Sequence, residues 1–216
     1  MNEDFPYMQR VALTVERRLN AAEGASLEAF ARLFFRWAAR INLGSIAGRA
    51  DLVDRHLIDA FAAARFIGEG ARVADVGSGG GLPAIPLAIL SPGAKFDLFE
   101  PTAKKVAFLR TAIRELGLGG RVQVHPSRVE EPIGADLLQA FDVAVSRATL
   151  APDVWLALGR QLIAGDGRVL VFATRDSEGA LPSPESVVAY GPNRRLLAFG
   201  VPHVGRAASD IPTRST

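Results

Sequence analysis

A glycine-rich turn between two apolar segments constrains this chain more than any other feature. Residues 75–89 read DVGSGGGLPAIPLAI, and the segment that leads into them, RVADV at 72–76, has the composition of a buried strand. A strand, a glycine turn and a helix in this order are typical of an open α/β sheet, in which backbone amides at the turn can approach a ligand closely. We therefore predict that this turn binds a ligand.

Beyond residue 70, short apolar segments alternate with helical patterns. The segments with a strand-like composition are 72–76, 95–100, 121–126, 141–147 and 167–174. Helices are expected after the glycine turn, over 102–116 and before the last of these strands, and extended segments near 186–190 and 194–201 predict a hairpin around 191–193. The alternation predicts an α/β fold with a doubly wound, mostly parallel, Rossmann-like sheet that ends in an antiparallel hairpin.

The chain before residue 70 has a helical periodicity. Apolar side chains recur at spacings of three and four on one face, and they are Phe30, Leu33, Phe34, Trp37 and Ile41. The opposite face carries a stripe of arginines, Arg32, Arg36 and Arg40. A further helix is expected over 51–67. We predict a helical cap at 1–68, a sheet domain at 69–205 and a flexible tail at 206–216.

Composition excludes several kinds of site. The 216 residues include no cysteine, which removes disulfides, thiolate metal sites and cysteine nucleophiles. The three histidines are far apart in sequence, so we expect no metal site. No apolar stretch approaches the ~20 residues that span a bilayer, and the acidic start of the chain lacks the apolar core of a signal peptide. We expect a cytoplasmic protein with no membrane partner.

The positions of the glycines limit the class of ligand that the turn is expected to bind. A dinucleotide fingerprint needs glycine at position 82, where Leu82 stands, and the Gly-Lys-Ser/Thr of a phosphate-binding P-loop is absent. The remaining pattern, acidic-x-G-x-G-x-G, resembles the first motif of class I S-adenosylmethionine-dependent methyltransferases. It is formed by Asp75, Gly77, Gly79 and Gly81.

Glu100 supports a nucleoside ligand. It ends the second expected strand, about twenty residues after the turn, where a carboxylate can accept hydrogen bonds from both ribose hydroxyls. Dinucleotide enzymes share this feature, so Glu100 indicates a nucleoside and leaves the cofactor open.

Several further segments resemble one known family. They are INL (41–43), VDRHLIDAF (53–61), FEPTAKKVAFL (99–109), HPSRVEE (125–131) and FDVAVSRA (141–148). With the glycine turn, this series is similar to the glucose-inhibited division protein B family, bacterial methyltransferases that modify N7 of a guanine in the 530 loop of 16S ribosomal RNA. The resemblance implies a class I methyltransferase fold with a helical cap, S-adenosyl-L-methionine as cofactor, and 16S rRNA or the small ribosomal subunit as partner.

The resemblance also implies roles for individual residues. The family's cofactor contacts fall on Gly77, Leu82, Val129, Glu130 and Arg147. Gly77 would admit the methionine moiety, Val129 and Glu130 would flank the adenine, and Arg147 would pair with a carboxylate or an RNA phosphate. An RNA substrate also suggests salt-dependent phosphate contacts for the arginine stripe.

The implied chemistry agrees with what the residues lack. Guanine N7 is already nucleophilic, so methyl transfer to it needs alignment and exclusion of water without a strong base. No acid or base pair is evident, and the position where an exocyclic-amine methyltransferase has Asp/Asn-Pro-Pro-aromatic reads SRAT, residues 146–149. We identify no catalytic acid or base.

The chain departs from the family pattern at three places. Gly44 follows Asn42-Leu43 in place of a threonine, Ala84 replaces a glycine of the turn, and Arg175 stands near the end of the fifth strand, where relatives have a lysine. Two other functions therefore stay open: methylation of another RNA or a small molecule, and nucleoside binding without catalysis.

Overall fold

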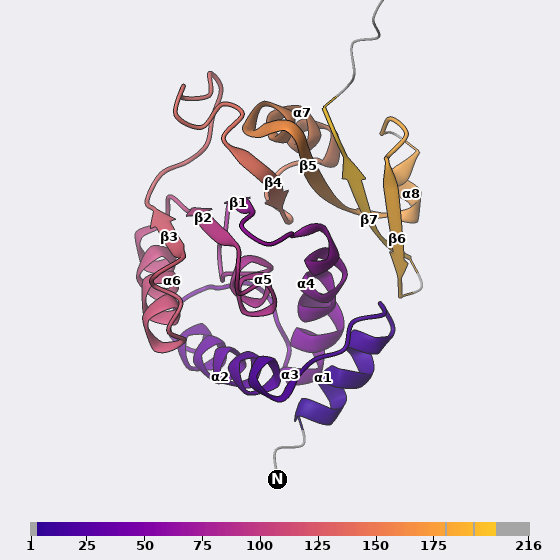
Figure 1. The fold of residues 1–216 in the computed structure, drawn as a ribbon. Coiled ribbons are helices and arrows are strands. Elements are labelled where there is room, and N and C mark those ends of the chain that lie inside the picture. The colour runs from indigo at the N-terminus through magenta and orange to yellow at the C-terminus, as the bar shows by residue number, and fades with distance from the viewer. Residues whose placement is uncertain (1–3, 180, 192, 202–216) are drawn as a thin grey trace, which may run out of the picture.

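The structure, a computed structural model, describes residues 4–179, 181–191 and 193–201. One seven-stranded sheet, in the order β3-β2-β1-β4-β5-β7-β6, runs through the molecule (Figure 1). Its strands are β1 (Arg72–Val76), β2 (Lys95–Phe99), β3 (Val122–His125), β4 (Phe141–Ser146), β5 (Ile163–Thr174), β6 (Ser186–Tyr190) and β7 (Arg194–Phe199). Strands β1 to β5 are parallel, and β7 pairs antiparallel with both β5 and β6. The predicted mixed sheet is confirmed.

Helices lie both before the sheet and between its strands. Before the sheet lie α1 (Asp4–Leu13), α2 (Ala21–Ala38), α3 (Arg49–Leu52), the π-helical turn η1 (Val53–Leu57), α4 (Ile58–Ala63) and the 3₁₀ turn η2 (Ala64–Phe66). Between the strands lie α5 (Ala84–Leu90), α6 (Ala103–Glu115), α7 (Pro152–Leu162) and α8 (Arg175–Glu178). The helix expected over 51–67 is present, with a π-helical turn in its middle.

Helix α2 begins earlier than its apolar stripe. Asn20 caps the helix by accepting from the backbone N–H of Glu23, and the Glu23 carboxylate accepts from the backbone of Asn20 in return. Phe30, Leu33 and Phe34 of the apolar face are buried, whereas Trp37 and Ile41 are partly buried against the same core. The Phe34 ring meets the Phe108 ring of α6 edge to face. Because α2 ends at Ala38, Arg40 lies beyond the helix and only partly extends the stripe.

Strand β5 is longer than its apolar pattern predicts. It starts at Ile163, directly after α7, although the expected strand began at residue 167. Ile163 pairs with Phe141, but the next paired residue in β5 is Arg168 opposite Val143, so the intervening residues bulge. Gly165 and Gly167 in this bulge hide the strand from a search for alternating apolar residues.

Helices cover the two faces of the sheet unequally. Helices α4, α5 and α6 lie on one face, and α1 and α2 form a further layer beyond them (Figure 1). On the other face, α7 and the loop that contains Val129 and Ile133 pack against β4 and β5. One apolar core contains both Phe34 of α2 and Leu87 of α5. The cap boundary at residue 68 stays a prediction, and the predicted tail lies outside the described residues.

Candidate functional site

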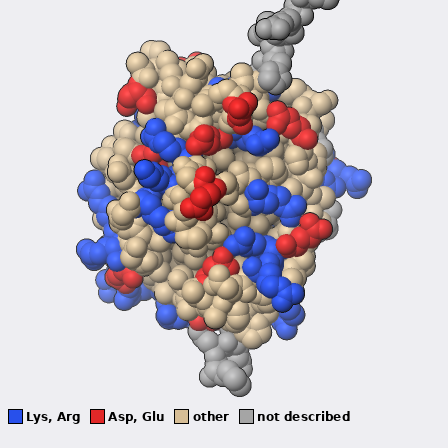
Figure 2. Space-filling model, in the orientation of Figure 1, with Lys and Arg blue, Asp and Glu red and all other residues tan. Residues whose placement is uncertain are grey.

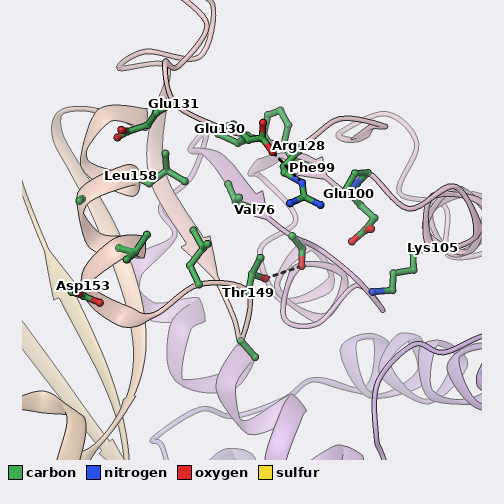
Figure 3. A pocket seen from close by; sticks show the side chains of 17 residues that line it. Val76, Phe99, Glu100, Lys105, Arg128, Glu130, Glu131, Thr149, Asp153 and Leu158 are labelled. Atoms are coloured by element: carbon green, nitrogen blue, oxygen red, sulfur yellow. Dashed lines mark hydrogen bonds and ion pairs between the residues drawn. The ribbon is translucent and has the colours of Figure 1, made fainter.

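A cleft of about 950 Å³ lies at the carboxyl ends of the parallel strands. It spans the point where the strand order reverses, because β1 is flanked by β2 on one side and β4 on the other. Ligands in open α/β sheets bind at such a position. The segments that line the cleft follow β1, β2, β3 and β4, and α7 closes one side with Asp153, Val154, Ala157 and Leu158 (Figure 3).

Backbone hydrogen bonds fix the glycine turn to the end of β2. The backbone N–H groups of Gly77 and Ser78 donate to the carbonyl oxygen of Phe99 at 2.9 and 3.1 Å. Gly77 has a φ of 76°, a left-handed conformation that glycine adopts without strain. A Cβ atom at Gly77 would lie 2.4 Å from the Oγ1 atom of Thr149. Glycine is therefore required here by Thr149 of this chain, before any ligand is considered.

Glu100 lies in the wall of the cleft and is 4% exposed. Its two carboxylate oxygens accept from the backbone N–H groups of Gly79 at 2.9 Å and Thr102 at 2.8 Å. A carboxylate offers about four acceptor positions, so one on each oxygen is still available to a ligand. These two bonds fix the carboxylate and join the end of β2 to the glycine turn.

The loop after β3 supplies another wall. Val129 is buried against the core around α7, whereas Glu130 is exposed and forms an ion pair with Arg128 at 3.3 Å. Figure 3 shows this pair at the opposite side of the cleft from Asp153. Because both members of the pair are mostly exposed, it contributes little to stability, and Glu130 can change partner at small cost.

The nine residues predicted to bind the cofactor do not all reach the cleft. Gly77, Glu100, Val129 and Glu130 line it. The other five have different places in the fold. Asp75 is buried beneath the turn, and Gly79 and Gly81 shape the turn with φ of 55° and 73°. Leu82 packs against the apolar core, and Arg147 pairs with Asp59 of α4.

Arg147 belongs to an ion network around Asp59. Asp59 is fully buried; its Oδ2 lies 2.6 Å from the Nε of Arg147, and its Oδ1 lies 2.9 Å from Nη2 of Arg194. The Tyr190 hydroxyl donates to Asp59 at 2.7 Å. A second guanidinium nitrogen of Arg147 donates to Nδ1 of His56. The network joins the α3–α4 helical segment, the end of β4 and the β6–β7 hairpin.

The network changes the acid–base properties of its members. Burial raises the pKa of the Asp59 carboxyl, and the two guanidinium groups oppose this rise. Burial first, and then the charge of Arg147, lowers the pKa of His56 to about 4. His56 is therefore neutral at physiological pH, which fits an Nδ1 that accepts a hydrogen bond. Its Nε2 is buried without a partner among the described residues.

Sequence reasoning missed several residues that join the segments around the cleft. Tyr190 and Arg194 are 131 and 135 residues from Asp59, and no local pattern connects them. The segment 53–61 contributed only to the family resemblance, with no role for Asp59. Thr149 also escaped notice, although the SRAT segment itself was singled out, because its approach to Gly77 depends on β4 lying beside β1.

The predicted RNA-binding arginines are exposed but not equivalent. Arg36 forms an ion pair with Glu115 of α6 at 2.8 Å. Arg32 and Arg40 have no ion pair to the described residues. Arg36 therefore holds α2 against α6 in addition to any contact with a ligand.

The three departures from the family pattern lie outside the lining of the cleft. Gly44 has a φ of 128° and open space around the position of a Cβ atom. Ala84 is the first residue of α5 and is fully buried. Arg175 is exposed at the start of α8. The described residues hold no cluster of three acidic or histidine side chains suited to a metal ion, and none of their helices is long and apolar enough to cross a bilayer.

Comparison with known proteins identifies the family. The family described as GidB, rRNA small subunit methyltransferase G, matches residues 23–186. A ribosomal RNA small subunit methyltransferase G from Acidiphilium cryptum is 40% identical over 77% of this chain and 76% of its own length. The relative of the same name from Halorhodospira halophila is 36% identical over 84% of this chain and 85% of its own length.

A solved structure supports the fold. An RNA methyltransferase from Salinibacter ruber, crystallised with S-adenosyl-L-homocysteine, superimposes with a TM-score of 0.54 at 19% identity, over 73% of this chain and 94% of its own. Its fold is that of S-adenosylmethionine-dependent methyltransferases. The family match covers most of the chain, including the glycine turn, Glu100 and the loop after β3. The chain belongs to the rRNA small subunit methyltransferase G family.

Proposed function

We propose that the protein transfers a methyl group from S-adenosyl-L-methionine to N7 of a guanine in the 530 loop of bacterial 16S rRNA. The observation that carries the proposal is the cleft at the carboxyl ends of β1, β2 and β4, in a chain of this methyltransferase family. In this proposal the protein acts in the cytoplasm, on the small ribosomal subunit or its RNA.

The residues of the cleft suit a cationic nucleoside. The volume lies at the upper end of the ~300–1,000 Å³ typical of small-molecule sites. Four carboxylates line it against two cations, so the cleft favours a positively charged ligand; they are Glu100, Glu130, Glu131 and Asp153, against Lys105 and Arg128. When bound, S-adenosylmethionine supplies an electrophilic methyl group on a cationic sulfur.

We assign separate tasks to the walls of the cleft. Glu100 holds the ribose through the acceptor positions that Gly79 and Thr102 leave available. Val129 packs against the adenine, and Glu130 accepts a hydrogen bond from it. Guanine N7 needs no general base, so the chain's remaining work is alignment of the base and exclusion of water. Leu150 and Val154, apolar residues 39% and 50% exposed in the lining, offer the surface on which a base can pack.

The decisive test is direct. Small ribosomal subunits from a strain that lacks the family enzyme are incubated with the protein and methyl-labelled S-adenosylmethionine, and N7-methylguanine is mapped by chemical strand cleavage. We expect label at one guanine of the 530 loop. Label elsewhere would indicate another RNA substrate. Cofactor binding without transfer to these subunits would leave another substrate or a nucleoside-binding module without catalysis as the function.

The adenine contact can be tested separately. Glu130→Ala removes an exposed side chain with one exposed ion pair, so we expect unchanged stability. We expect about tenfold weaker binding of S-adenosyl-L-homocysteine by calorimetry, because a hydrogen bond to a charged group contributes about 1.5–3 kcal/mol. Glu16→Ala, at another exposed glutamate in an ion pair, is the control. Equal affinity of the two variants would remove Glu130 from the site.

A further inference from the structure

Helix α6 carries an excess of positive charge that the described residues do not neutralise. Its four cations are Lys104, Lys105, Arg110 and Arg114, and its single acid, Glu115, is already paired with Arg36 of α2. None of the four cations has an ion pair or a side-chain hydrogen bond to any residue that the structure describes. We call these four residues the α6 track.

Several arginines elsewhere in the protein have internal partners. Arg147 and Arg194 pair with Asp59, Arg17 pairs with Glu23, and Arg121 donates to backbone carbonyls at the end of α5. The α6 track differs from these arginines because its four cations lie on one helix and have no ion pair to the described residues. Repulsion among unpaired cations on one helix disfavours folding, and an anionic partner would relieve it.

The track leads directly to the cleft. Lys105 lines the cleft, and Figure 3 shows its ammonium group directed toward the side where Glu100 lies. Lys104, Arg110 and Arg114 are exposed on the outer face of α6. With a rise of 1.5 Å per residue, Lys104 and Arg114 are about 15 Å apart along the helix.

The arginines of α2 extend the same surface. The ion pair between Arg36 and Glu115 places the end of α2 beside the end of α6. Arg32 is exposed one turn earlier on the same helix. Figure 2 shows Lys and Arg side chains gathered along the edge of the molecule over α6, where acidic side chains are sparse.

We propose that the α6 track binds backbone phosphates of the substrate RNA and directs the strand into the cleft from the β2–β3 side of the sheet. The proposal rests on the proposed function and deepens it, because it assigns the docking surface to α6, with α2 as its extension. Lysine and arginine at the surface of a helix contact phosphates without reading bases, so the track contributes affinity and position and leaves the choice of base to the cleft.

The test compares two pairs of substitutions that remove equal charge. Arg110→Gln with Arg114→Gln removes half of the track, at residues outside the lining of the cleft. Arg18→Gln with Lys95→Gln removes two other exposed cations that have no ion pair to the described residues. Lys95 lies at the amino end of β2, the opposite edge of the sheet from the cleft. Binding to unmethylated small subunits and to naked 16S rRNA is measured over a series of salt concentrations.

We expect the track variant to bind about tenfold more weakly at ~0.1 M salt, with the slope of log affinity against log salt shallower by roughly 1.4 to 1.8, as two lost phosphate contacts predict. The control variant should retain the slope and affinity of the unchanged protein. Both variants should bind S-adenosyl-L-homocysteine normally and keep the rate of transfer at saturating subunit concentration.

Equal slopes of log affinity against log salt for the two variants would overturn the proposal. The proposal would also fail if the unchanged protein bound neither the small subunits nor naked 16S rRNA at any salt concentration. The binding measurement does not require methyl transfer. A protein that binds RNA through the track but transfers no label would refute the proposed function alone. A protein that transfers label, with equal slopes for the two variants, would refute the track alone.

Discussion

Asp59 and Asp75 are two almost equally buried aspartates with opposite surroundings. Asp59 is 0% exposed and contacts Arg147, Arg194 and Tyr190, whereas Asp75 is 1% exposed and its Oδ2 has no hydrogen bond to the described residues. Burial raises the pKa of both carboxyl groups. At Asp59, two guanidinium charges oppose this rise. At Asp75, only a hydrogen bond from the Ser78 hydroxyl opposes it, and the charge of Glu100 adds to it. The pKa of Asp75 therefore reaches about 7.

The difference shows that burial alone does not define the role of a carboxyl group. Asp59 is a charged cross-link between segments distant in sequence, and the structure around it depends on its charge. Asp75 lies beneath the glycine turn and is protonated below about pH 7, so the turn rests on a neutral group at lower pH. A buried charge is retained where partners compensate it and is neutralised where they do not.

The largest effect is expected at Asp59. Asp59→Asn leaves two partly buried guanidinium groups without a counter-charge, which costs about 3–5 kcal/mol in the free energy of unfolding. Urea denaturation measures it, and Glu16→Gln, which removes an exposed partner of Arg65, should cost less than about 1 kcal/mol. Similar losses in the two variants would mean that the network contributes no more than a surface pair.

The next effect concerns the pH dependence of stability. The pKa of Asp75 is raised, so the folded protein binds a proton that the unfolded chain releases between about pH 4 and 7. Stability from this group is complete below the unfolded pKa and is lost as the pH rises through 7, with a slope of up to about 1.4 kcal/mol per pH unit. Asp75→Asn should remove this slope in urea denaturation at pH 5, 6 and 7.

A constant offset between Asp75→Asn and the unchanged protein over this range would contradict a protonated Asp75. The offset itself carries no information on the proton, because the amide differs from the acid in its hydrogen bonds. Only the change of the offset with pH tests the comparison with Asp59.

The smallest effect is expected at His56, and its sign is opposite. The pKa of His56 is lowered to about 4, so the folded protein excludes a proton that the unfolded chain binds below about pH 6.5. Its contribution to stability is present above pH 6.5 and is lost as the pH falls toward 4. His56→Gln should therefore become more stable relative to the unchanged protein between pH 6.5 and 5.

In the unchanged protein, the pH dependences of stability that arise from Asp75 and His56 partly cancel. Substituting one of these residues therefore leaves the pH dependence that arises from the other. Denaturation of His56→Gln should show stability falling with rising pH, whereas Asp75→Asn should show it rising. A His56→Gln profile parallel to that of the unchanged protein would mean that the histidine titrates alike in the folded and unfolded chains.

Elements set by local pattern were predictable. Strand β1 and the hairpin strand β6 match their expected residues, and the glycine turn and Glu100 were located from spacing alone. Strand β5 was predicted short because glycines interrupt its alternation, and the start of α2 was hidden because its cap at Asn20 precedes the apolar stripe. Prediction failed where the deciding contact is with another segment.

The sequence by itself determined the order of strands and helices along the chain, the place of the glycine turn and the family, because each of these depends on periodicity or on residues close together in the chain. Only the tertiary structure decided that Thr149 requires glycine at position 77 and that Arg147 is held by Asp59 rather than lining the cleft. It also decided that the cations of α6 have no ion pair within the described part of the chain. These depend on which side chains meet across the sheet, and such meetings follow from packing between segments that no local pattern connects.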